Sequence, residues 1–208
     1  MSRGTREQTR AIVIGGSIAG LLTARVLSEF FEQVTIVDRD HFPPAGEPRR
    51  GVPQSVQPHV LFTRGYRILE ELFPGIGNDL KSAGAIPIDW GKEFHYFTKG
   101  AFNATVEEGS GLVSFTCTRP LLEGTVRNQV DLVPNIEWLE GSRVCGLIGS
   151  AEQVKGIRYR TSHHEEEQQL ALDSLFHKIP AMSGTDRQAG HHWPERNADW
   201  ILAMASLT

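Results

Sequence analysis

The chain has 208 residues, of which 39% are hydrophobic and 22% charged, and its formal net charge is −4. This composition is too apolar and too weakly charged for a disordered protein, and the acidic balance without a long Lys/Arg run argues against nucleic acid as the main partner. Cys117 and Cys145 are too few for a disulfide framework or a zinc site, and such sparse cysteine is typical of the cytoplasm. No run of about 18 apolar residues occurs, so the sequence predicts no transmembrane helix.

The first structured segment is predicted to be a strand, a turn, a helix and a second strand. Residues 11–14 are a short β-branched run, residues 15–20 are rich in glycine, and the apolar positions of residues 21–30 follow a helical period. Residues 33–37 form a second buried strand that ends at Asp38. This order is typical of a βαβ unit with parallel strands.

The middle of the chain mixes loop, helix and strand signals. Residues 41–58 are rich in Pro, Gly and Arg and indicate an irregular loop, and a helix is expected from about residue 59 to the stop at Pro74-Gly75. A helix with Pro120 in its first turn is expected over residues 119–130. Six strands are expected in this part, at 86–88, 94–98, 113–115, 136–139, 143–148 and 154–161. The first three are expected to form an antiparallel excursion and the last two a hairpin.

The pattern changes after about Ser162. Residues 163–169 are a polar run of His, Glu and Gln, and the apolar residues beyond it have no clear period, so no further strand is expected. The predicted organisation is a polar extension over 1–10, an α/β domain over 11–161 and an atypical tail over 162–208, disordered or frame-shifted. The spacing of the histidines in the tail matches no metal-ligand pattern, so no metal site is predicted.

The glycine turn carries the strongest chemical signal. It lies between a strand and a helix, and an acid follows 23 positions after Gly15, close to the spacing of dinucleotide-binding units. Gly15 permits a tight turn, the small Ser17 stands where the strict pattern has glycine, and Gly20 lets the helix pack on the strand. The start of the helix offers N–H groups to a pyrophosphate. Asp38 suits a ribose 2′-hydroxyl, while Arg39 beside it suits a 2′-phosphate, and the turn alone leaves FAD and NAD open.

Further segments along residues 10 to 161 have a common pattern. They are Arg49-Arg50-Gly51-Val52-Pro53-Gln54, His59-Val60-Leu61, Leu72-Phe73-Pro74-Gly75, Ala85-Ile86-Pro87-Ile88-Asp89-Trp90, Thr118-Arg119-Pro120-Leu121-Leu122-Glu123, Asn135-Ile136-Glu137 and Arg143-Val144-Cys145-Gly146-Leu147. Together they resemble the FAD-binding part of FAD-dependent monooxygenases, in the branch of hydroxylases and epoxidases similar to squalene epoxidase and polyether epoxidases.

The resemblance implies a Rossmann-like FAD-binding fold and an oxidoreductase function. In that family a nicotinamide nucleotide, NADH or NADPH, reduces FAD, and one oxygen atom of dioxygen passes to a small organic substrate. The cofactor carries this chemistry, so no catalytic side chain is nominated. The resemblance assigns the turn to the pyrophosphate, Asp38 to the ribose, Arg119 to the phosphates, Val144 to adenine through its backbone, and Arg49 and Gln54 to the flavin side. The predicted cofactor-binding residues are Gly15, Gly16, Ser17, Ile18, Ala19, Gly20, Asp38, Arg39, Arg49, Gln54, Arg119 and Val144.

The resemblance ends near Ala171. Family members are roughly twice as long, which is more than one domain needs, and they continue with a strand and an Asp-Ala-Ser/Thr-Gly-Arg-like motif. Residues 170–177 of this chain lack that motif, so the fold is predicted to be truncated and the tail replaced or frame-shifted. Two alternatives remain: an NAD-dependent Rossmann oxidoreductase, or a non-catalytic module, which is either a flavin-binding interaction partner or a truncated half that associates with a complementary chain.

Overall fold

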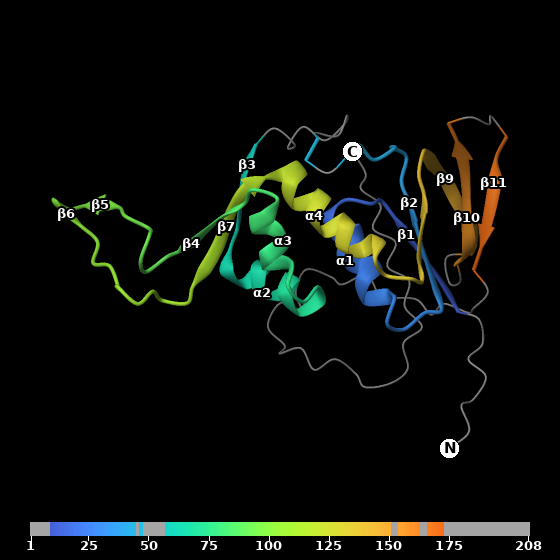
Figure 1. Ribbon diagram of the computed structural model, residues 1–208. Coiled ribbons are helices and arrows are strands. Elements are labelled where there is room, and N and C mark those ends of the chain that lie inside the picture. The colour runs from blue at the N-terminus through green and yellow to red at the C-terminus, as the bar shows by residue number, and fades with distance from the viewer. Residues whose placement is uncertain (1–8, 45, 48–56, 151–153, 163–165, 173–208) are drawn as a thin grey trace, which may run out of the picture. The chain divides into compact units, whose positions relative to one another are not determined.

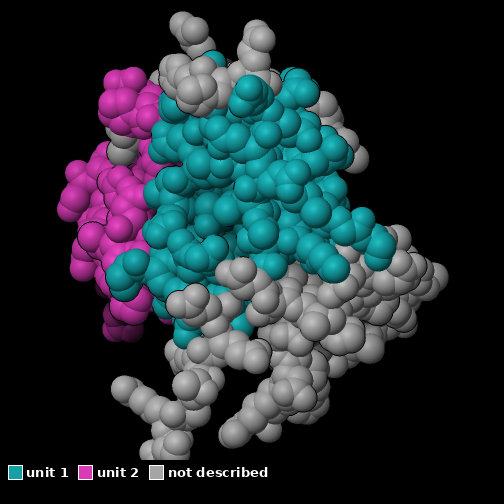
Figure 2. Space-filling view, turned by 90° about the vertical axis from the view of Figure 1, so that its right-hand side faces the viewer, with its two compact units in different colours: residues 1–41, 134–208 teal, residues 42–133 magenta. Residues whose placement is uncertain are grey.

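The computed structural model describes residues 9–44, 46–47, 57–150, 154–162 and 166–172. These residues fall into two compact units, one made of Met1–His41 and Pro134–Thr208 and the other of Phe42–Val133 (Figure 2). Unit 1 contains β1 (Arg10–Ile14), α1 (Ile18–Leu27), β2 (Gln33–Val37), β8 (Ile136–Leu139), β9 (Ser142–Gly149), β10 (Val154–Thr161) and β11 (Gln168–Ala171). Unit 2 contains β3 (Pro58–Leu61), α2 (Thr63–Leu72), α3 (Ile76–Ser82), β4 (Ile86–Asp89), β5 (Phe97–Thr98), β6 (Ala101–Phe102), β7 (Val113–Thr118) and α4 (Arg119–Asp131).

Unit 1 is built on a parallel sheet with the strand order β1-β2-β8 (Figure 1). The predicted βαβ unit is therefore confirmed, with Ile12 of β1 paired with Thr35 of β2. Both faces of this sheet are covered, which explains why its strands read as nearly continuous apolar runs. Val13, Val34 and Ile36 are each at most 2% exposed, and α1 contributes the buried Leu21 and Ala24.

The second sheet of unit 1 is an antiparallel meander with the order β11-β10-β9. Ile157 and Tyr159 of β10 form one core cluster with Ile12 and Val37 of the parallel sheet. The predicted hairpin of β9 and β10 is confirmed. The expectation of no strand after residue 161 is wrong for Gln168–Ala171, because β11 pairs with β10 and Leu170 packs against the cluster. The remainder of the predicted tail, residues 173–208, lies outside the described residues.

Unit 2 combines three helices with an antiparallel sheet of order β3-β7-β4. The helix expected at residue 119 is confirmed as α4, with Pro120 in its first turn and the Thr118 hydroxyl accepting a hydrogen bond from the Leu121 N–H at 3.3 Å. No helix in the described part of the chain is long and apolar enough to cross a membrane.

The structure corrects one sequence prediction for unit 2 and adds one helix that the sequence analysis does not predict. The helix expected from about residue 59 begins only at Thr63, because Pro58–Leu61 is β3 and Leu61 pairs with Phe115 of β7. A further helix, α3, follows the Pro74-Gly75 stop almost at once. Gly75 takes a left-handed φ of +93°, and the Glu70 carboxylate accepts its N–H at 2.7 Å, which starts the new helix.

Residues 90–112, which we call the arm, connect β4 to β7 and are held at their base by one carboxylate. Asp89 accepts hydrogen bonds from the N–H groups of Gly91, Lys92 and Gly111 at 2.9 to 3.2 Å. It also accepts the N–H of Ser110 at 2.9 Å and the Ser110 hydroxyl at 2.7 Å. Donation by the Ser110 N–H, and then by its hydroxyl, holds the pKa of the Asp89 carboxyl well below its usual range.

Replacing Asp89 by asparagine is expected to loosen the arm without unfolding unit 1. The amide keeps one acceptor oxygen and turns an NH₂ toward N–H donors, so several of these bonds are lost. Because the pKa is lowered in the folded protein, the stabilisation is present above the unfolded pKa of about 3.9 and is lost as the pH falls through the lower folded value. Chymotrypsin cleavage within the arm is therefore expected to be several-fold faster in Asp89→Asn than in the unmodified protein at pH 7, and the ratio of the two rates is expected to be constant between pH 5 and pH 8.

Glu107→Gln is the matched control for this prediction, because Glu107 is an exposed carboxylate on the same arm. Equal cleavage rates for the Asp89 and Glu107 variants would show that the arm does not depend on the Asp89 carboxylate.

Candidate nucleotide-binding site

The glycine turn of unit 1 has the strained geometry that the sequence predicts. Gly15 has a φ of +95°, and its N–H donates to the Val37 carbonyl at 2.8 Å, so the turn leaves β1 while attached to β2. Gly20 faces this turn from the first part of α1. A Cβ on Gly20 would overlap the carbonyl oxygen of Gly15 and lie 3.4 Å from Val13. Both positions therefore require glycine for a stated steric reason.

The start of α1 is arranged to receive an acceptor-rich group. Ser17 is the N-cap residue, with extended backbone at φ −85° and ψ −178°, and its hydroxyl makes no capping hydrogen bond. The Ser17 carbonyl accepts the Leu21 N–H at 2.9 Å, which is the first turn of the helix. The N–H groups of Ile18 and Ala19 precede that bond and have no acceptor within an α-helix, so they are available to an anion there.

Asp38 joins the turn to the end of β2. One carboxylate oxygen accepts the Gly16 N–H at 2.6 Å, and the other accepts the Asp40 N–H at 2.9 Å. The residue is 6% exposed, and its backbone is held by Leu139 and Ser142 at 3.1 and 2.8 Å. A carboxylate can accept about four hydrogen bonds, so Asp38 has the capacity to bind a ribose hydroxyl in addition.

The loop after Asp38 is anchored by residues that sequence reasoning missed. His41 lies between Glu140 and Ser162, with Nδ1 3.6 Å from the carboxylate and Nε2 3.4 Å from the hydroxyl. The Gly141 N–H donates to the Asp40 carbonyl at 3.2 Å. These partners are about 100 residues or more from His41 in the sequence, and no local pattern connects them. Among the described residues, no group of three His, Cys, Asp or Glu side chains is placed to hold a metal ion.

The remaining predicted site residues are distributed over the chain. Arg39 is 63% exposed and lies 3.8 Å from Asp40, and Val144 on β9 is half-buried opposite Tyr159. Arg119 begins α4 in unit 2, with Nε 3.4 Å from the buried carboxylate of Glu123. Arg49 and Gln54 lie outside the described residues. The structure thus brings together the turn at Gly15–Gly20 and Asp38, and the cofactor-binding roles of all the predicted site residues stay predictions.

Comparisons of sequence identify longer relatives. No protein-family model matches the chain. It is 37% identical over 131 residues to protein Rv3254 of Mycobacterium tuberculosis, a match that covers 61% of this chain and 27% of that protein. It is 27% identical over 180 residues to squalene monooxygenase of Mus musculus, covering 81% of this chain and 29% of the enzyme. The chain therefore spans less than a third of the curated relatives it matches.

Solved structures share the fold at low sequence identity. The flavin-dependent monooxygenase PieE, solved with FAD and substrate, aligns with a TM-score of 0.57 and 19% identity, over 81% of this chain and 29% of that one. The p-nitrophenol 4-monooxygenase PnpA from Pseudomonas putida aligns with a TM-score of 0.54 and 15% identity, over 78% and 38%. The halogenase CndH, described as FAD-dependent, aligns with a TM-score of 0.54 and 17% identity, over 80% and 36%. In sequence the chain thus resembles a part of squalene monooxygenase, and it shares its fold with a part of these longer flavin-dependent enzymes.

Proposed function

We propose that unit 1 binds FAD and that the protein acts in NADH- or NADPH-dependent oxygen transfer to a small organic substrate. The observation that carries the proposal is the closure of the glycine turn on the acid, in which the Gly16 N–H donates to Asp38 at 2.6 Å beside the left-handed Gly15. Relatives that bind FAD favour this cofactor over NAD alone. The bound flavin would supply the oxygen chemistry, as the cofactor does in such enzymes.

The described residues fit the adenosine and pyrophosphate half of FAD. The Ser17 hydroxyl, which makes no capping hydrogen bond, and the N–H groups of Ile18 and Ala19 are donors for phosphate oxygens. Asp38 accepts from the ribose and carries a negative charge that disfavours a 2′-phosphate. Val144 and Arg119 are proposed to contact adenine and the phosphates, and Arg49 and Gln54 the flavin side. The role of these residues is to bind and orient the cofactor.

A ligand series tests this assignment. Because the fitted half of the site recognises adenosine and pyrophosphate, FAD is expected to bind, ADP is expected to compete with it, and FMN, which lacks adenosine, is expected to bind weakly. Flavin absorbance at about 450 nm that comigrates with the protein in gel filtration gives the first readout, and titration of flavin fluorescence gives the affinities.

Three results would contradict the proposal. FMN binding as tightly as FAD would place the recognition on the flavin rather than on the turn. Displacement of FAD by NAD at lower concentration than by ADP would favour an NAD-dependent oxidoreductase. A folded protein that retains no flavin at all would leave a non-catalytic module as the better description.

The proposed activity depends on parts of the family fold to which no residue of this chain is matched. The matches cover 27% to 31% of the curated relatives, so the proposed oxygen transfer requires polypeptide that residues 1–208 do not supply. We propose that a complementary polypeptide provides it and that the protein works in the cytoplasm. NADPH or NADH oxidation by the FAD-loaded chain, measured with and without such a polypeptide, tests this requirement.

A further inference from the structure

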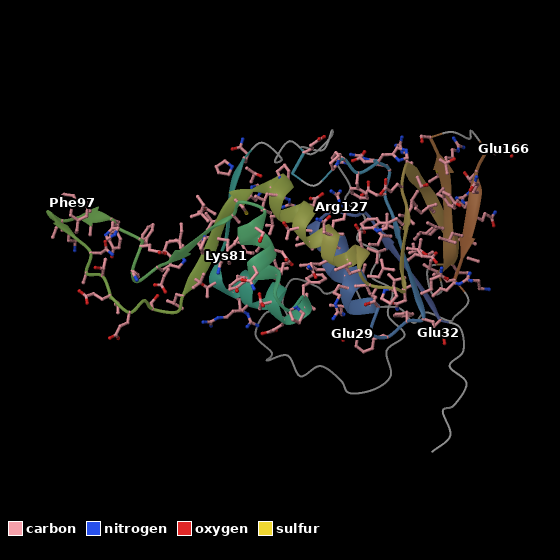
Figure 3. All side chains as sticks on the ribbon, viewed as in Figure 1. Glu29, Glu32, Lys81, Phe97, Arg127 and Glu166 are labelled. Carbon is pink, nitrogen blue, oxygen red and sulfur yellow. The ribbon has the colours of Figure 1, made fainter. Side chains whose placement is uncertain are left out.

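Three segments of unit 1 meet beside Asp38. The loop of residues 38–41, which we call the acid loop, follows β2, and it lies at the same end of unit 1 as the turn between β8 and β9 and the end of β10 (Figures 1 and 3). The Ser142 N–H donates to the Asp38 carbonyl at 2.8 Å, and the Gly141 N–H donates to the Asp40 carbonyl at 3.2 Å. The position of the Asp38 carboxylate therefore depends on contacts with the β8–β9 turn.

One imidazole closes this junction. The His41 ring lies against Gly141, where an added Cβ would overlap it, so the absence of a side chain at Gly141 leaves room for the ring. Its Nδ1 lies 3.6 Å from the Glu140 carboxylate, and its Nε2 lies 3.4 Å from the Ser162 hydroxyl. The Ser162 N–H donates to the Gly141 carbonyl at 2.9 Å. His41 thus connects the acid loop to both of the other segments.

The partners of His41 suit both charge states of the ring. In a neutral imidazole one nitrogen donates and the other accepts, so Nδ1–H can face the Glu140 carboxylate while Nε2 faces the proton of the Ser162 hydroxyl. In a protonated imidazole both nitrogens donate, and the Ser162 oxygen accepts instead. Protonation therefore keeps the partners and adds an attraction between opposite charges.

The charges around His41 set the sign of this effect. The charged side chains on the acid loop, the turn and the adjoining strand ends are Asp38, Arg39, Asp40, Glu140, Arg143 and Arg160. Arg39 lies 3.8 Å from the Asp40 carboxylate, and Arg160 also has a carboxylate partner at 3.8 Å. Glu140 is the carboxylate beside the His41 ring. A positive charge on His41 is therefore attracted to the turn, and this attraction is lost when the pH rises and the ring becomes neutral.

We infer that His41 is a positioning residue for the nucleotide site and that its protonation holds the acid loop more firmly on the β8–β9 turn. The loop must be ordered for the Asp38 carboxylate to receive a ribose hydroxyl, and order that exists before binding does not have to be supplied by the ligand. FAD affinity is therefore expected to rise as the pH falls from 8 to 6. The inference rests on the proposed function for its ligand, whereas the change in the loop can be measured without FAD.

The expected effect is small because the pair is partly exposed. The side chains of His41 and Glu140 are 62% and 36% exposed. Water and salt screen such pairs, so the affinity is expected to change by about two- to fivefold between pH 8 and pH 6. FAD is the suitable ligand for this comparison, because a terminal phosphate such as that of ADP changes its charge at about pH 6.

Two variants remove the charge pair and keep polar groups in its place. His41→Gln introduces a side chain that cannot be protonated, and Glu140→Gln removes the negative partner. The double variant tests whether the two residues act as one unit. His95→Gln is the matched control, because it removes an exposed histidine of unit 2.

Amide hydrogen exchange of the full 208-residue chain without FAD measures the loop directly. After correction for the intrinsic exchange rate at each pH, the protection of the Gly141 and Ser142 N–H groups is compared at pH 6 and pH 8. It is expected to be about two- to fivefold greater at pH 6 in the unmodified chain and in His95→Gln. In His41→Gln, Glu140→Gln and the double variant this difference is expected to vanish.

Titration of flavin fluorescence is expected to follow the same pattern. The unmodified chain and His95→Gln are expected to bind FAD about two- to fivefold more tightly at pH 6 than at pH 8. The other three variants are expected to bind FAD equally at the two pH values. At pH 8 the ring is neutral, so His41→Gln is expected to bind FAD like the unmodified chain, which distinguishes an effect of charge from a loss of structure.

Three outcomes would overturn the inference. A pH difference that persists in His41→Gln would place the titrating group elsewhere. Weaker FAD binding by His41→Gln, by the same factor at both pH values, would show that the side chain acts without its charge. Protection of Gly141 and Ser142 that is the same at both pH values in the unmodified chain would show that protonation does not hold the loop. Absence of FAD binding at both pH values, with protection that follows His41, would contradict the proposed function and support the effect on the loop.

Discussion

Replacing Gly20 by alanine is expected to abolish FAD binding and to destabilise unit 1 by roughly 3 kcal/mol or more, at the upper end of overpacking effects. The added methyl group would overlap the Gly15 carbonyl oxygen, which belongs to the backbone and cannot rotate away. Either α1 must move off β1 or the turn must open. Both changes displace the N–H groups of Ile18 and Ala19 from the place where phosphates are proposed to bind.

Gly65→Ala is the matched control for this prediction. Gly65 also lies in a helix, α2, but the nearest atom to its added Cβ is Cδ1 of Leu61 at 3.0 Å, the end of a flexible side chain. Alanine favours the helix by about 1 kcal/mol over glycine, which offsets this contact. Urea unfolding gives the stability and flavin fluorescence the affinity. If the Gly20 variant had the same free energy of unfolding and the same FAD affinity as the Gly65 variant, neither stability nor FAD binding would depend on the close approach of α1 to the turn.

Asp38→Asn is expected to weaken FAD binding about 10- to 100-fold, because a hydrogen bond to a charged acceptor is worth about 1.5–3 kcal/mol. The asparagine oxygen still accepts the Gly16 N–H, and of the hydrogen bonds from Gly16 and Asp40 only the one from the Asp40 N–H is lost within the protein, so the turn is expected to keep its shape and the protein to stay folded. The loss falls on the ribose contact. ADP is therefore expected to weaken by the same factor as FAD, whereas the weak binding of FMN is expected to remain unchanged.

Asp40→Asn provides the control, with the same loss of charge two residues away. Its carboxylate lies 3.8 Å from Arg39, on a side chain that is 28% exposed. The two variants are compared by isothermal titration with FAD, ADP and FMN. Equal effects of the two substitutions would show a general dependence on loop charge and would remove Asp38 from the proposed ribose site.

The local parts of the site could be predicted from the sequence because each depends on neighbouring residues. A β-branched run, glycines at set positions and an acid after the next strand predict the turn, and the structure adds the direct hydrogen bond between Gly16 and Asp38. The anchoring of the following loop by His41, Glu140 and Ser162 depends on residues far apart in the chain. The hydrophobic periodicity of a single segment cannot predict such a contact.

Two of the elements that sequence reasoning missed, β3 and β11, depend on pairing with another strand, and the third, α3, depends on a side-chain hydrogen bond. Residues 58–61 fit a helical pattern as well as a strand, and only the pairing of Leu61 with Phe115 decides for β3. The polar run before Leu170 hides β11, which is ordered by hydrogen bonds to β10 rather than by its own composition. The helix α3 depends on the Glu70 carboxylate, which accepts the N–H groups of Gly75 and Gly77. From the sequence, Pro74 and Gly75 indicate only the end of the preceding helix.

The sequence by itself determined the βαβ unit, the glycine turn and the acid of the candidate nucleotide site, because sterics and hydrophobic periodicity act within one segment of chain. Only the tertiary structure decided that Asp38 closes on the Gly16 N–H, that β3 and β11 are strands, and that an aromatic arm stands on the Asp89 carboxylate. Each of these features has at least one stabilising partner in a distant part of the chain, and such pairings are fixed by packing and hydrogen bonding between segments that no local pattern connects.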